Sequence, residues 1–184
     1  MEKVVLSEID IITGTIDCPK GFEINRDKIK NDIITSFINQ ERISNNEKNY
    51  SYNDYKVPFS QPLQWFKDYL RDHFKLEHNK TLIPKLDFGI ILEKKQKSHT
   101  RNLVEPLDLL HAPDYTCIYG VDIDDEEQLE VVILYDDNRR VNRTWHLPLQ
   151  NNGYIIFPST QRFFINESKS SKLQSILIST YEYI

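Results

Sequence analysis

The sequence predicts a single domain that is mainly β with helices at its N-terminal end, and therefore an α+β protein. Apolar residues recur at helical spacing over two stretches of residues 1–85. From Leu86 onward they form short runs that alternate with turn residues, the pattern of an antiparallel sandwich or barrel. The length of 184 residues favours one domain over two. We expect one domain over residues 1–184, with two helices in 1–85 bracing a β-sandwich in 86–184.

The first half begins with a β-branched run and continues with a helix. Residues 4–16 predict a strand, which the turn Cys18-Pro19-Lys20-Gly21 ends. Asn25 is placed to cap a helix over residues 26–43. The polar run that follows makes residues 44–60 a long flexible loop, whose three tyrosines suit a lid or a recognition surface.

A second helix is predicted after Ser60 and Pro62, with a broad apolar face. The residues on that face are Leu63, Trp65, Phe66, Tyr69, Leu70, His73, Phe74 and Leu76. Beyond the helix the pattern changes to strands, which we expect at residues 87–92, 115–123, 129–135, 144–149, 154–157, 163–165 and 173–183. The polar runs DDEE at 124–127 and DDNR at 136–139 predict two hairpin tips.

Composition and charge exclude several classes of function. A hydrophobic content of 39% with 28% charged residues is typical of a soluble globular domain. The formal net charge of -5 gives no basic surface for nucleic acid, so we expect no nucleic-acid partner. No apolar run approaches the roughly 18 residues of a membrane span, and the first residues do not form a signal peptide. We therefore expect a cytoplasmic protein without a membrane partner, and with Cys18 and Cys117 as reduced thiols.

The use of amino acids is unusual in one respect. Ala112 is the single alanine of the chain, whereas asparagine, isoleucine and lysine are abundant. An AT-rich genome produces this bias, which suggests a viral (phage) or bacterial origin.

Two stretches of the second half carry a resemblance to a known family. The first is residues 111–121, HAPDYTCIYGV, and the second is residues 153–159, GYIIFPS. Together they resemble the 2-oxoglutarate/iron(II)-dependent oxygenases, especially small phage and bacterial members. The resemblance covers residues 86–184 and implies a double-stranded β-helix, a jelly-roll sandwich, as the core.

The resemblance also implies a cofactor site. Enzymes of this family hold iron(II) with two histidines and one carboxylate, and leave the other face of the metal to 2-oxoglutarate and dioxygen. A basic residue on a late strand then pairs with the far carboxylate of 2-oxoglutarate. Iron(II) and 2-oxoglutarate are thus the expected cofactors of an active protein, and hydroxylation of a C–H bond its expected reaction.

The ligand positions match this pattern only in part. His111 falls at the place of the first ligand, and strand alternation puts it on an apolar, inward face with residues 115, 117, 119 and 121. The second position falls on Pro113, although an irregular backbone there would turn Asp114 inward. The third position falls on Phe163, which cannot bind a metal.

Other residues are candidates for the missing roles. His146 is the reserve third ligand, although its neighbours Trp145 and Leu147 take the apolar face of the strand. Lys172 or Arg162 is the candidate partner for the carboxylate of 2-oxoglutarate.

Two functional hypotheses remain open at this point. The first is a hydroxylase with a shifted or degenerate metal site made by His111, Asp114 and His146, acting on an unknown small molecule or protein. The second is a non-catalytic jelly-roll module for binding or for structure, with no cofactor. The replacement of expected ligands by Pro113 and Phe163 favours the second.

Overall fold

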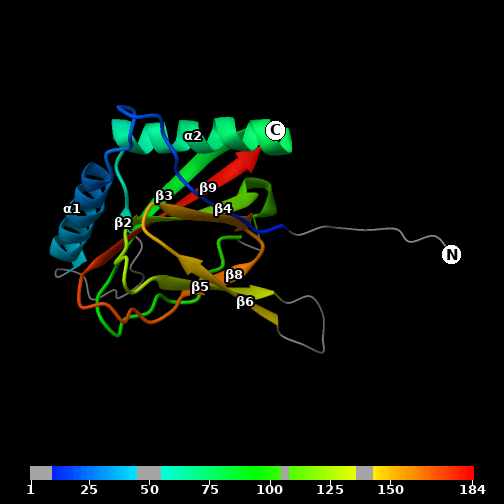
Figure 1. Ribbon diagram of the computed structural model, residues 1–184. Helices are drawn as coiled ribbons and strands as arrows, with labels where there is room; N and C mark the ends of the chain where they lie inside the picture. The colour runs from blue at the N-terminus through cyan, green and yellow to red at the C-terminus, as the bar shows by residue number, and fades with distance from the viewer. Residues whose placement is uncertain (1–9, 45–54, 105–107, 136–142) are drawn as a thin grey trace.

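A computed structural model of the protein describes residues 10–44, 55–104, 108–135 and 143–184, which form two helices and two antiparallel sheets (Figure 1). The six-stranded sheet has the order β1-β7-β4-β9-β3-β2, and the three-stranded sheet has the order β6-β5-β8. The elements are β1 (Ile12–Thr15), α1 (Arg26–Ser44), β2 (Tyr55–Lys56), α2 (Gln61–His78), β3 (Leu82–Leu92), the 3-10 helix η1 (Leu109–His111), β4 (Tyr115–Asp122), β5 (Leu129–Tyr135), β6 (Arg143–Leu149), β7 (Gly153–Pro158), β8 (Arg162–Ile165) and β9 (Gln174–Tyr183).

Helix α1 begins where the capping residue predicts it. The Oδ1 atom of Asn25 accepts a hydrogen bond of 3.0 Å from the backbone N–H of Lys28. Ile29 and Ile33 are fully buried and pack the helix onto the large sheet. The packing is so close at β3 that a Cβ atom on Gly89 would lie 2.5 Å from the Cγ2 atom of Ile33. Glycine is therefore required where α1 crosses β3.

Helix α2 packs through a narrower stripe than the sequence predicts. Its buried side chains are Leu63, Phe66, Leu70 and Phe74. Trp65 and Leu76, which we expected on the same face, are 46% and 86% exposed. The helix ends at Asn79, whose left-handed backbone (φ 52°) lets its N–H bond to the carbonyl of Lys75 at 3.1 Å. No helix among the described residues is long and apolar enough to cross a membrane.

The large sheet is covered on both faces. Figure 1 shows α2 on one side of it and β5, β6 and β8 on the other. The helix-side core includes Cys117, Tyr119, Val121, Ile156, Leu177 and Tyr181. The core between the sheets includes Ile90, Ile118, Ile133, Ile155, Phe157, Phe163, Ile165, Ile176 and Ile178. Strands β4 and β9 are consequently buried on both faces along most of their length.

This architecture confirms the predicted fold class, a mainly β jelly roll braced by two helices. Strand β5 has the predicted bounds. Strands β4, β6, β8 and β9 differ from them by one residue at one end, and β7 differs by one residue at each end. Strand β3 begins at Leu82, earlier than predicted. An irregularity between Pro84 and Asp87 breaks its alternation, so the sequence pattern did not reveal the first part of this strand.

Other predictions fall partly outside the described residues. The expected first strand is shorter here, since β1 spans Ile12–Thr15 and residues 1–9 are not described. The expected loop at 44–60 contains the short strand β2, and its residues 45–54 are not described. The predicted hairpin tip at 136–139 also lies outside the described residues.

Residues 98–101 extend the small sheet beyond β8. The N–H of Ser98 donates to the carbonyl of Ile165 at 3.0 Å, and Arg101 forms an antiparallel bridge with Phe163. In space, this segment lies beside Phe163, the residue at the expected third ligand position, and His111 does not.

Candidate functional site

The expected third ligand position lies in the space between the two sheets. Phe163 occupies it and is fully buried. Its ring contacts that of Phe157 edge-on, with centroids 5.2 Å apart and an interplanar angle of 72°. The surrounding side chains are aliphatic, and they belong to the core between the sheets described above. A hydrocarbon core therefore fills the place where the sequence pattern expects a metal ligand.

The residue beside Phe163 across the sheet is Arg101. The N–H of Arg101 donates to the Phe163 carbonyl at 2.7 Å, and the N–H of Phe163 donates back at 3.1 Å. Arg101 is only 7% exposed, and burial lowers the pKa of its guanidinium to about 10. It is thus a cation at neutral pH, and a guanidinium has no lone pair to offer a metal ion.

His111, the expected first ligand, lies outside the strands. It ends the 3-10 helix η1, and its side chain is 73% exposed. Its Nδ1 atom lies 2.8 Å from the Oδ1 atom of Asp108, and its carbonyl accepts a bond of 2.8 Å from the Nζ atom of Lys85. The histidine is thus held by local contacts at the surface.

The sequence placed one face of β4 toward the expected metal site, and the structure corrects this. Cys117, Tyr119 and Val121 do share one face, but this face packs against the helices, while Ile118 packs between the sheets. Because β4 is buried on both faces, alternation of polar and apolar residues cannot tell one side from the other.

Asp114 and His146 also serve local contacts. The backbone N–H of Asp114 donates to the Tyr181 carbonyl at 2.8 Å, and its Oδ2 atom accepts from the N–H of Tyr183 at 3.1 Å. His146 lies on the solvent side of β6, with Nδ1 3.1 Å from the Oε2 atom of Glu130. This side agrees with the sequence, since Leu147 packs on the core between the sheets.

The two candidate partners of 2-oxoglutarate point away from the core. Arg162 is exposed on β8, where Phe163 takes the inward side. The Nζ atom of Lys172 lies 3.3 Å from the Oδ1 atom of Asp124, and its side chain is 74% exposed. The polar residue that faces inward at the start of β9 is Gln174, which is buried and donates from Nε2 to the Oγ atom of Ser168 at 2.8 Å. An uncharged amide therefore stands near the place where we expected a cation.

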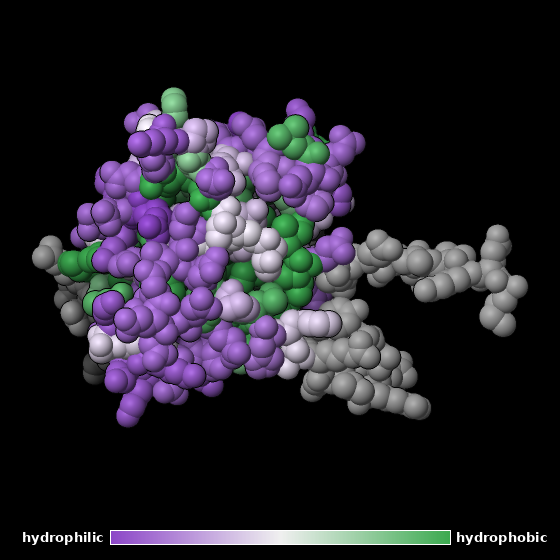
Figure 2. Space-filling model, viewed as in Figure 1, coloured by the Kyte–Doolittle hydropathy of each residue, from purple (hydrophilic) through white to green (hydrophobic). Residues whose placement is uncertain are grey.

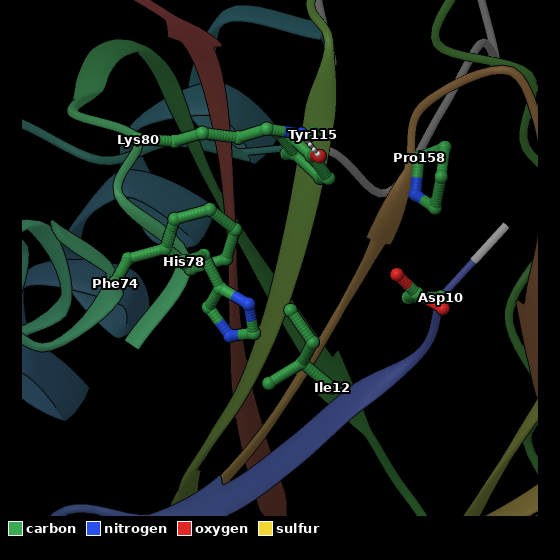
Figure 3. A pocket seen from close by; sticks show the side chains of 7 residues that line it. All are labelled: Asp10, Ile12, Phe74, His78, Lys80, Tyr115 and Pro158. Carbon is green, nitrogen blue, oxygen red and sulfur yellow. Dashed lines mark hydrogen bonds between the residues drawn. The ribbon is translucent and has the colours of Figure 1, made fainter. Parts of the chain in front are cut away.

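A pocket that the sequence did not predict lies on the helix side of the large sheet (Figure 3). It has a volume of about 210 Å³ and opens between the end of α2, β1 and the neighbouring ends of β4 and β7. Its lining residues are Asp10, Ile12, Phe74, His78, Lys80, Tyr115 and Pro158. Figure 2 shows apolar residues reaching the surface below this end of α2, in a mainly polar face.

Lys80 and Tyr115 form the polar centre of this pocket. The Nζ atom of Lys80 donates to the Oη atom of Tyr115 at 3.0 Å and lies 4.6 Å from the centre of the Tyr183 ring. The hydrogen bond to Tyr115 raises the pKa of Lys80, and the nearby Asp10 adds to this effect. Phe74 packs edge-on against Tyr115, with ring centroids 5.4 Å apart. The lysine is therefore a fixed ammonium group beside an aromatic wall.

Comparison with known proteins bears on the fold. No family model and no curated protein matches the sequence. A viral collagen prolyl hydroxylase from Paramecium Bursaria Chlorella virus-1, solved with 2-oxoglutarate, superposes with a TM-score of 0.55 at 10% identity, covering 92% of this chain and 94% of that one. A prolyl-4-hydroxylase from Pseudomonas putida gives 0.54 at 8% identity over 94% and 91%. The chain has the fold of the 2-oxoglutarate/iron(II) oxygenases.

A third match differs in length. An oxidoreductase of the 2OG-Fe(II) oxygenase family from Burkholderia pseudomallei has a TM-score of 0.44 at 8% identity. The match covers 67% of this chain and 52% of that one. The chain thus spans about half of that protein.

Among the described residues, the side chains that the sequence pattern assigns to an iron site do not come together. Iron(II) in these enzymes needs three donors from histidine and carboxylate side chains on one side of the metal. Across the described segments, no three side chains of His, Cys, Asp or Glu lie close enough to hold a metal ion. His111 and Asp114 bind local partners at one end of β4, whereas His146 binds Glu130 on the outer face of the small sheet.

Proposed function

We propose that this protein is a binding module built on the oxygenase fold, which does not hold iron(II) by the three-ligand arrangement of the enzymes. Phe163 is the observation that carries the proposal. Its ring is fully buried against Phe157 in the core between the sheets. Burial of such a side chain stabilises a fold by roughly 1.5–3 kcal/mol, and the aromatic pair adds about 0.5–1.5 kcal/mol. The residue is thus part of the core that stabilises the sheets.

Arg101 supports the same proposal by its chemistry. A guanidinium beside the ligand position has no lone pair to offer a metal ion. Gln174 adds a second argument, because a neutral amide gives no ion pair to the far carboxylate of 2-oxoglutarate.

Anaerobic titration with iron(II) and 2-oxoglutarate tests the proposal. We expect no visible charge-transfer band and no thermal stabilisation with both components at millimolar concentration. A band would support the rival hypothesis, a hydroxylase with a shifted ligand set.

Variants separate the two hypotheses further. If a band appears and disappears in His111→Ala, Asp114→Asn or His146→Ala, the binding-module proposal is wrong. His73→Ala is the matched control, because His73 is a partly exposed histidine on α2 with an ion-pair partner of its own, Glu77 at 3.3 Å. A band that persists in all these variants would also contradict the proposal, since it would place iron elsewhere in the chain.

A further inference from the structure

The pocket of Figure 3 is separate from the core between the sheets. It lies on the helix side of the large sheet, and none of its residues takes part in the expected iron site. Its volume of about 210 Å³ is below the roughly 300–1,000 Å³ of pockets for drug-sized ligands. A ligand of amino-acid size suits it better than a nucleotide or a peptide chain.

One side of the pocket offers hydrogen-bond donors. Lys80 has three N–H groups, and one of them is directed at the Tyr115 hydroxyl. Because the hydroxyl accepts this bond, its own proton points elsewhere, and Lys80 is the one hydrogen-bond partner of the Tyr115 hydroxyl among the described residues. An ammonium and a phenol that both donate form a suitable site for a carboxylate.

The other side of the pocket favours a cation. The carboxylate of Asp10 lies across the pocket from His78, next to Pro158 (Figure 3). The C-terminal end of α2 reaches the pocket at His78 and adds partial negative charge from its last carbonyl groups. A simple anion would be repelled by this side, and a simple cation would be repelled by Lys80.

We propose that this pocket binds a small zwitterion of the α-amino-acid type, with its carboxylate at Lys80 and Tyr115 and its ammonium group at Asp10. Ile12, Phe74 and Pro158 supply apolar wall for an aliphatic side chain. The proposal goes beyond the binding module inferred above, because it names a ligand class and uses a different part of the molecule. The two can fail independently, since iron binding and pocket binding are read by different measurements.

L-leucine is a suitable probe, and two analogues each lack one of its charges. 4-Methylpentanoate keeps the carboxylate without the ammonium group, and 3-methylbutylamine keeps the amine without the carboxylate. In two-dimensional ¹H–¹⁵N NMR titrations we expect leucine to shift the amide resonances of Lys80, Thr81 and Tyr115. We expect each analogue to bind about threefold to fivefold more weakly, the effect of one partly exposed ion pair.

Substitutions assign each charge to its residue. Lys80→Met keeps the aliphatic stem, and should abolish the preference for leucine over 3-methylbutylamine. Asp10→Asn should abolish the preference for leucine over 4-methylpentanoate. Lys75→Met is the matched control, because Lys75 is an exposed lysine in the last turn of α2, five residues before Lys80, and does not line the pocket.

Several outcomes would overturn the proposal. They are the absence of shifts at these amides with leucine at tens of millimolar, equal binding of leucine and 4-methylpentanoate, and unchanged preferences in Lys80→Met. Equal binding of the carboxylate alone would identify an anion site in place of the zwitterion site.

Discussion

Arg101 and Phe163 exchange two backbone hydrogen bonds, of 2.7 and 3.1 Å, on adjacent segments of the small sheet. The pair stands where the sequence pattern expects a metal ligand, and it brings together a buried cation and a buried aromatic ring. Neither side chain can bind a metal ion, because a guanidinium has no free lone pair and a phenyl ring has no donor atom. The oxygenase fold is thus retained with side chains that suit a closed core.

We expect that replacing Phe163 by histidine creates no iron site, because no group of three metal-binding side chains lies together among the described residues. We expect Phe163→His to lower the free energy of unfolding by about 2–4 kcal/mol, since it removes core contacts and buries a polar ring. Urea denaturation measures the change, and the anaerobic iron(II) titration should still show no band.

Phe164 provides the control for this variant. It lies on the other side of β8, is partly exposed, and has the Nζ atom of Lys97 5.9 Å from its ring centre. Phe164→His should cost less than about 1 kcal/mol. If Phe163→His were equally mild, or if it gained iron binding, the assignment of Phe163 to a closed core would be wrong.

A second prediction concerns the ion pair between Lys67 on α2 and Asp87 on β3. Their side chains are only 12% and 11% exposed, and Asp87 also accepts a bond of 2.7 Å from the Oγ atom of Ser179. Asp87→Ala leaves the lysine charge buried without its partner, so we expect a loss of about 3–5 kcal/mol in the free energy of unfolding.

The exposed pair of Asp68 and Arg71 on the same helix is the comparison. Their atoms are 2.8 Å apart, but the side chains are 36% and 41% exposed. Arg71→Ala should change the free energy of unfolding by less than about 1 kcal/mol in the same denaturation experiment. Similar losses in the two variants would show that burial does not strengthen the pair with Asp87.

Local signals in the sequence predicted most of the fold. Asn25 marks the start of α1, and the alternation of short apolar runs and turns gives strands β4 to β9 to within one residue at either end. The direction of each strand face, toward the helices or toward the second sheet, was harder to predict. Strand β4 is apolar on both faces, so the side occupied by Cys117 or Ile118 depends on the helices that fold over it.

The candidate site was less predictable than the fold. His111 lies close in sequence to the strand that carries the resemblance, yet the segment that reaches Phe163 in space is 98–101. Lys80 and Tyr115 are 35 residues apart and meet only because α2 ends above the start of β4. No spacing rule within one element would have paired them.

Buried acidic groups predict a loss of stability at alkaline pH. Burial raises the pKa of the Cys117 thiol and of the Tyr181 hydroxyl well above their ordinary values of 9.0 and 10.0. Above pH about 9 the unfolded chain therefore binds fewer protons than the folded one, so the free energy of unfolding falls as pH rises. Urea denaturation from about pH 7 to about pH 10.5 should show this decline.

Tyr181→Phe identifies the contribution of one of these groups. The Tyr181 hydroxyl is buried and has no hydrogen-bond partner among the described residues, so its removal should be neutral or stabilising at neutral pH. The alkaline decline should be shallower in the variant. Tyr183→Phe, at an exposed position of the same strand, should leave the decline unchanged. A decline as steep in Tyr181→Phe as in the parent would exclude Tyr181 as a cause.

The contact between Gly89 and Ile33 gives a last prediction, on how α1 is held against the large sheet. A methyl group at residue 89 would overlap the Ile33 side chain, with carbons only 2.5 Å apart. We expect Gly89→Ala to lower the free energy of unfolding by about 1–3 kcal/mol, the usual cost of overpacking a core.

Ile33→Ala alone is also destabilising, because it leaves a cavity. The double variant should nevertheless be more stable than the sum of the two losses predicts, since the new methyl group fills part of that cavity. Additive losses in denaturation experiments would show that α1 moves away from β3 instead of clashing with it.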